Sequence, residues 1–241
     1  MLRAELLTAR STRSVWALAG VAVLACAGWT VADVLAFMTG PDAGQVESAY
    51  SMAQQGYLFA MIMGVLVVAG EYRHQTITWA LLVTPRRERV IAGKLVACGV
   101  LGLLTGLAAV VVTVPVAALL LAGAGYPAWA PGVPVALAGS VLSTLLWTMF
   151  GGALGALLRN QVAAIVVAFG WFFYAEWALV ALVPAVGRWT PTGAAKAVSG
   201  WTPVDVAGPL LPMWAGGLVF LGYTAAAAAV ATAVSVRRDV T

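Results

Sequence analysis

The stretch GEYRHQTITWALLVTPRRERVIAGK, residues 70–94, carries five of the chain's 13 lysine and arginine residues, two glutamates and the only histidine. Long apolar runs precede and follow it. A charged side chain at the centre of a bilayer costs about 2.5–3.5 kcal/mol, so a block with this many charges has to lie outside the hydrocarbon. The stretch therefore predicts a polar connection between two membrane spans.

The composition of the whole chain agrees with this prediction. Hydrophobic residues make up 62% and charged residues 9%, whereas soluble domains have about 45–50% and about 25%. Backbone groups in lipid must bond within their own segment, and the apolar runs are too long for barrel strands. We expect an all-α integral membrane protein with six transmembrane helices. The runs are Val15–Phe37, Ala53–Gly70, about Val96–Leu121, Val133–Leu158, Val162–Val183 and about Met213–Val236.

The basic residues predict the orientation of these helices. All but two of the 13 fall in one set of connections and at the two ends of the chain, and the exceptions are Arg188 and Lys196. Because loops rich in lysine and arginine stay on the cytoplasmic side, both termini should be cytoplasmic in a multi-pass protein of the cell membrane. The basic residues are divided among loops that flank spans, so the net charge of +4 does not indicate a nucleic-acid partner.

Three segments outside the spans have their own pattern. Residues 1–14 suit a short interfacial helix, with a frayed terminus as the alternative, and the apolar run that follows is too long for a cleaved signal peptide. Met38–Met52 lacks basic residues and is expected to be an outer loop. Residues 184–212 contain five prolines and two tryptophans. We expect an outer cap or re-entrant element there, with an ordinary loop as the alternative.

Catalytic and metal chemistry has little support in the sequence. A phosphate-binding loop ends in Gly-Lys-Ser/Thr, and neither Lys94 nor Lys196 is followed by serine or threonine. Glu71 and His74 could form half of a carboxylate-bridged metal site, but the other ligands are missing. The two cysteines, Cys26 and Cys98, lie within predicted spans and lack metal-ligand spacing. We therefore expect neither an ATPase site nor a resident metal.

Two acidic residues, Asp33 and Glu176, lie within predicted spans. Such residues are functional candidates by default, and both could belong to a translocation path or an outer gate. Each also sits toward the predicted outer end of its span, where an acid can be partly hydrated. For Asp33 this structural interpretation is favoured, whereas for Glu176 the two interpretations are balanced.

The order of residues in the basic segment resembles the cytoplasmic loop of type-2 ABC exporter permeases. Members of that family have a Glu-aromatic-Arg start, a Gly-Thr step, a leucine-rich stretch, a proline with basic residues, and a lysine that opens the next helix. Gln75 stands where the family usually has glycine. The matching residues are Glu71, Tyr72, Arg73, Thr76, Leu81, Leu82, Pro85, Arg86, Arg89 and Lys94.

The resemblance implies a division of labour between chains. Two six-helix permease halves, identical or related, would work with separate ATP-binding cassette subunits, which hold ATP and magnesium. The segment 71–94 would contain a coupling helix that docks on the ATP-binding subunit. The chain itself would move a hydrophobic or amphipathic substrate, such as a drug, peptide or lipid, out of the cytoplasm. It would contact membrane lipid and perform no covalent catalysis.

Two other classes of protein remain as alternatives. A stand-alone structural or immunity-type membrane protein would have the same spans without an ATPase, but it would not need the ordered basic segment. A secondary transporter would need inverted repeats or coupling-ion sites, and the sequence has no clear sign of either.

Overall fold

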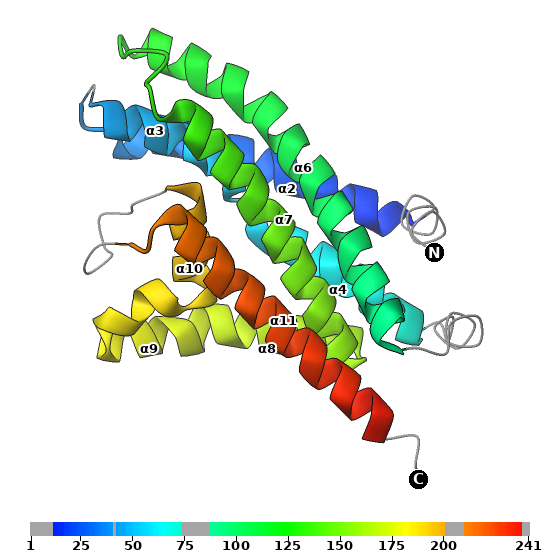
Figure 1. Ribbon diagram of the computed structural model, residues 1–241. Helices are drawn as coiled ribbons and strands as arrows, with labels where there is room; N and C mark the ends of the chain where they lie inside the picture. Colours follow the sequence, from blue (N-terminus) through cyan, green and yellow to red (C-terminus); the bar gives the residue numbers. More distant parts are fainter. Residues whose placement is uncertain (1–11, 41, 74–86, 201–209, 238–241) are drawn as a thin grey trace.

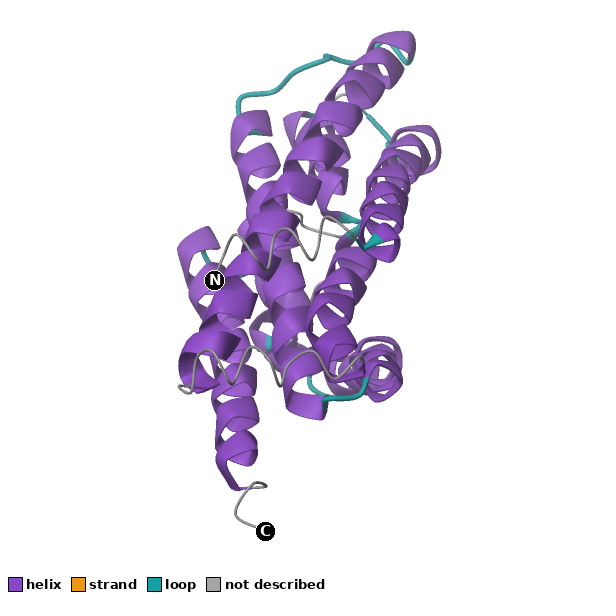
Figure 2. Cartoon of the chain, turned by 90° about the vertical axis from the view of Figure 1, so that its right-hand side faces the viewer, coloured by secondary structure: helices purple, strands orange, loops and turns teal. Residues whose placement is uncertain are grey.

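The computed structural model describes residues 12–40, 42–73, 87–200 and 210–237, and every regular element in these ranges is a helix. Six helical stretches are long and apolar enough to cross a membrane: Arg13–Phe37, Ala43–Arg73, Glu88–Gly123, Val133–Leu158, Gln161–Leu182 and Met213–Val234. The predicted fold class is therefore confirmed. Figure 2 shows that helix makes up nearly all of the described chain.

The first two spans are built from several helices each. Helix α2 (Arg13–Ala32) continues into a π-helix, η1 (Asp33–Phe37). The second span begins with α3 (Ala43–Ser51), passes through a 3-10 turn, η2 (Met52–Gln54), and continues as α4 (Tyr57–Arg73).

The remaining four spans follow along the chain. They are α6 (Arg87–Gly123), α7 (Val133–Leu158), the broken span α8 (Gln161–Gly170), η3 (Trp171–Ala175) and α9 (Glu176–Leu182), and finally α11 (Met213–Arg237). Two short helices, η4 (Pro184–Trp189) and α10 (Pro191–Ser199), precede α11. Asn160 lies between α7 and α8 and caps the start of α8. Its side-chain oxygen accepts hydrogen bonds from the backbone N–H groups of Val162 and Ala163.

Helix α7 is the centre of the bundle. It packs against α4 and α6 on one side and against α10 and α11 on the other (Figure 1). Small residues make the contact with α4 close: a Cβ atom on Gly64 would overlap the backbone of Thr148, and one on Gly151 would overlap the backbone of Met61. By contrast, α2, the α8–α9 span and α11 leave many large apolar side chains exposed, as expected of surfaces that face lipid or another chain.

The prediction of a loop over Met38–Met52 is wrong, because α3 occupies most of it. The helix forms because its apolar residues find partners far away in the sequence. Val46 and Tyr50 are fully buried in a cluster with Leu121 of α6 and Val133 of α7. Tyr50 also donates a hydrogen bond to the carbonyl of Ala128, at 2.5 Å.

Three other predicted segments are described only in part. Residues 1–11 of the predicted interfacial helix and residues 74–86 of the predicted coupling segment lie outside the described residues. So do residues 201–209 of the predicted cap, whose described part contains η4 and the largely buried helix α10. That α10 serves as a cap stays a prediction.

Candidate functional site: a basal junction and a polar cavity

The residues that the sequence assigns to coupling fall into two groups. Glu71, Tyr72 and Arg73 form the last turn of α4, and Arg89 and Lys94 lie in the first turns of α6. The other three, Thr76, Pro85 and Arg86, lie outside the described residues.

Glu71 and Lys94 form an ion pair that joins the end of α4 to the start of α6. The Lys94 ammonium donates to Oε1 of Glu71, and the side chain of Lys94 is 2% exposed while that of Glu71 is 14% exposed. A lysine is rarely buried to this extent unless it is paired. The pair therefore fixes the two helix ends that flank residues 74–86.

A second contact lies beside this pair. The Arg159 guanidinium lies 5.7 Å from the centre of the Tyr72 ring, a cation–π distance. Arg159 ends α7 in the left-handed conformation, with φ of 52°. Tyr72 also packs against buried Val68 of α4, Cys98 of α6, Ala156 of α7 and Ala231 of α11. We call Glu71, Tyr72, Lys94 and Arg159 the basal junction.

The basal junction joins the ends of α4, α6 and α7 through a charge pair and a ring contact. Arg73 and Arg89 are exposed beside it, so the paired and packed residues hold the helices together while these two arginines face outward. The described parts of the chain contain no group of three or more metal-ligating acids, histidines and cysteines.

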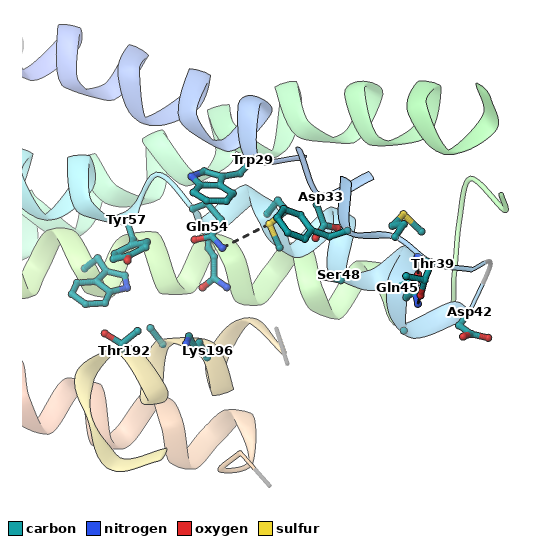
Figure 3. Close-up of a pocket in the computed structure, with 17 residues that line it drawn as sticks. Trp29, Asp33, Thr39, Asp42, Gln45, Ser48, Gln54, Tyr57, Thr192 and Lys196 are labelled. Atoms are coloured by element: carbon teal, nitrogen blue, oxygen red, sulfur yellow. Dashed lines mark hydrogen bonds between the residues drawn. The ribbon is translucent and has the colours of Figure 1, made fainter. Parts of the chain in front are cut away.

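A cavity of about 830 Å³ lies between the first two spans and α10 (Figure 3). Figure 3 shows Trp29 and Asp33 on one wall, Thr192 and Lys196 of α10 on the opposite wall, and Gln54 and Tyr57 between them. Its full lining is Trp29, Asp33, Phe37, Met38, Thr39, Asp42, Gly44, Gln45, Ser48, Met52, Gln54, Gln55, Tyr57, Trp147, Thr192, Ala195 and Lys196.

Two of the side chains that line the cavity are held by packing and hydrogen bonding. The Tyr57 ring stacks at a tilt on the buried Trp147 ring, with 5.0 Å between their centres. The Gln54 amide donates to the hydroxyl of Ser199 at the end of α10, at 2.5 Å. The cavity therefore has an ordered lining.

The two intramembrane acids occupy different places. Asp33 opens the π-helix η1 and lines the cavity. Glu176 directly follows the π-helix η3, is 5% exposed and does not line the cavity. Its Oε1 accepts a hydrogen bond from the backbone N–H of Thr192, at 3.1 Å, which ties α9 to the first turn of α10. Glu176 thus contacts the cavity wall indirectly, through α10.

Sequence reasoning missed most of the cavity. It singled out Asp33, but not Trp29, Tyr57 or the α10 residues Thr192 and Lys196. These side chains come from three separate parts of the chain, on α2, α4 and α10. The adjacent glutamines at 54 and 55, which interrupt an apolar region, were the available signal.

The fold and its six apolar spans define a multi-pass helical membrane protein. The family model of the ABC-2 family transporter proteins matches residues 3–240, and the chain belongs to this family. It is the membrane-spanning permease part of an ABC transporter, a component that works with an ATP-binding cassette subunit and is not itself the ATPase. No curated protein matches the chain.

Proposed function

We propose that this permease exports a hydrophobic or amphipathic substrate from the cytoplasm, with ATP and magnesium bound by a separate subunit. The family match over residues 3–240 carries the proposal. It disfavours the two alternatives, a stand-alone structural or immunity-type protein and a secondary transporter. The chain would lie in the cell membrane with both termini cytoplasmic.

The ATP-binding subunit would dock on the basic segment 71–94. The basal junction supports this position, because the Glu71–Lys94 ion pair joins the end of α4 to the start of α6, the two helices that flank residues 74–86. A force applied to that segment would reach α4 and α6 together. Arg73 and Arg89 are exposed beside the junction, and Thr76, Pro85 and Arg86 complete the expected contact surface.

A second permease half would complete the transporter. The broken span α8–α9 and the helix α2 both carry exposed aromatic side chains, among them Trp16, Trp171 and Trp177. These sparsely packed spans offer surface for another copy of the chain or for a related one, as well as for lipid.

The test is co-purification with the candidate ATP-binding subunit, followed by an ATPase assay in lipid with and without the permease. We expect a stable complex whose ATPase activity depends on the permease. Glu71→Ala and Arg86→Glu should each reduce this dependence while the chain stays in the membrane. Arg188→Glu is the matched control, since Arg188 belongs to the connections expected on the opposite side. Unchanged stimulation in both test variants would refute the coupling assignment.

A further inference from the structure

We propose that the cavity between α2, α4 and α10 binds a lipophilic monovalent cation, that is, an apolar or aromatic body with one ammonium- or phosphonium-type charge. The cavity measures about 830 Å³, and ligand sites in proteins typically measure about 300–1,000 Å³. It would therefore admit a molecule of drug size. Only the idea that the ligand is transported rests on the proposed function.

The charge of the ligand follows from Asp33. This carboxylate lines the cavity from within the first span, and its Oδ2 is covered by protein yet accepts no hydrogen bond from any described residue. The ion pair found among the described residues joins Glu71 to Lys94, so Asp33 has no basic partner there. Burying a carboxylate without a partner is costly. The Asp33 side chain is half-buried and lines the cavity, so a cation bound there would offset this cost by charge attraction to the carboxylate.

The remaining charges of the lining agree with this polarity. A second carboxylate, that of Asp42, lines the cavity, whereas its lining includes one lysine, Lys196. Lys196 already takes part in an interaction within the protein. The lining therefore carries more negative than positive charge and favours a cation over an anion of the same shape.

The apolar part of the ligand follows from the aromatic residues. Trp29, Phe37 and Tyr57 contribute rings to the lining, with the buried Trp147 ring in contact with Tyr57. Aromatic rings attract cations by about 0.5–2 kcal/mol, with tryptophan the most effective. They also offer apolar surface to the body of the ligand.

The first test compares two ions of the same shape and opposite charge on the wild-type chain. Radiolabelled tetraphenylphosphonium and tetraphenylborate are titrated against the full chain in phosphatidylglycerol nanodiscs, and binding to empty nanodiscs is subtracted. Each affinity is then referred to the concentration of that ion in the empty bilayer, because anionic lipid enriches the cation and repels the anion. We expect saturable binding of the cation at about one per chain, and at least tenfold weaker saturable binding of the anion. No saturable cation binding, or equal affinity for both ions, would overturn the proposal.

The second test uses variants of the cavity wall. Asp33→Asn keeps the size of the side chain and should weaken cation binding at least tenfold. Trp29→Leu should weaken it about threefold or more. The matched control is Trp177→Leu, because Trp177 is 73% exposed and lies outside the cavity. Wild-type affinity in Asp33→Asn, or equal losses in the two tryptophan variants, would contradict the assignment.

A third comparison identifies the source of the cation. Phosphatidylethanolamine presents an ammonium group on a lipid, and phosphatidylglycerol does not. Half of the lipid is replaced by phosphatidylethanolamine or, in a control with the same surface charge, by an uncharged glycolipid. If tetraphenylphosphonium binding is weaker with phosphatidylethanolamine than with the glycolipid, the site accepts a lipid headgroup. If binding is equal in the two, the site takes a free lipophilic cation. Both results support the site.

These binding tests are independent of the ATPase assay. Binding without ATPase coupling would retain the cavity and reject the permease–ATPase docking. Coupling without binding would retain the docking and reject the cavity.

Discussion

The ion pair between Glu71 and Lys94 yields a quantitative prediction about stability. Lys94 is 2% exposed and Glu71 is 14% exposed, so the pair is largely removed from solvent. Removing one member of a buried pair costs about 3–5 kcal/mol, because the other charge loses its attraction inside the protein. Since Glu71 retains some exposure and takes part in a further interaction, we take the lower end, about 3 kcal/mol, for Lys94→Met.

Replacement of both members should cost much less. Buried ion pairs replaced by apolar residues of similar volume are often neutral or more stable. We therefore expect Glu71→Leu with Lys94→Met to unfold close to the wild-type temperature. For chains of about 150–250 residues, 1 kcal/mol corresponds to about 2–4 °C, so Lys94→Met alone should lower the melting temperature by about 6–12 °C.

The two native cysteines supply the assay. Cys26 and Cys98 are buried thiols, so a thiol-reactive fluorogenic dye reacts with them only when the bundle opens. Arg89→Ala is the matched control, because Arg89 is an exposed charge on α6, and surface substitutions usually change stability by less than about 0.5 kcal/mol. If the effects of the two single substitutions simply add in the double variant, the buried pair is not coupled as the structure indicates.

Three further predictions concern packing, α10 and sidedness. Gly151→Leu should destabilise the bundle by about 1–3 kcal/mol or more in the same dye assay, because the new side chain meets the backbone of α4. The control Gly70→Ala should not, because a Cβ atom there meets nothing within 4 Å. Equal melting temperatures for the two variants would contradict the packing. Glu176→Ala should speed amide hydrogen exchange in the first turn of α10, because it removes the acceptor of the Thr192 N–H group. Glu176→Gln keeps an acceptor oxygen and should have a smaller effect. Unchanged exchange in the alanine variant would count against the contact. In intact cells, a membrane-impermeant maleimide should label Ala124→Cys but not Arg89→Cys; the reverse pattern would overturn the predicted orientation.

The number and approximate position of the spans could be predicted from sequence because hydropathy is a local property. A run such as Val133–Leu158 has to be helical in lipid whatever surrounds it. The predicted bounds of that span match the observed α7. Helix α3 was missed because polar residues at positions 45, 47 and 48 interrupt the pattern of its apolar face. The partners of that face lie on α6 and α7, far away in the sequence.

The candidate site residues could likewise be predicted where the signal is local, whereas their partners could not. Charges within apolar runs identified Asp33 and Glu176, and an ordered motif identified Glu71 and Lys94. Their partners could not be found locally, because Glu176 bonds to a backbone group on a different helix and Asp33 lies opposite α10 across the cavity (Figure 3).

The cavity and the basal junction lie at opposite ends of α4, and α7 packs along α4 between them. Helix α4 begins with Tyr57 at the cavity and contains Glu71 in its last turn, within 17 residues, a length of about 25 Å at 1.5 Å per residue. Helix α7 lies beside α4. Its Trp147 ring contacts Tyr57, and Arg159, which ends α7, lies over the Tyr72 ring.

The contact between α4 and α7 allows little independent sliding. Gly64 and Gly151 bring the two backbones so close that neither position has room for a Cβ atom, and closely packed interiors transmit strain. A displacement of α4 at Glu71 would therefore move Tyr57 and its wall of the cavity, while α10, which packs against α7, is also tied to α9 through Glu176. Movement at the basic segment would thus change the shape of the cavity by changing the distance between α4 and α10. A disulfide or a spin-label pair between these two helices would measure it directly: a distance that stays fixed when the ATP-binding subunit binds nucleotide would refute this coupling.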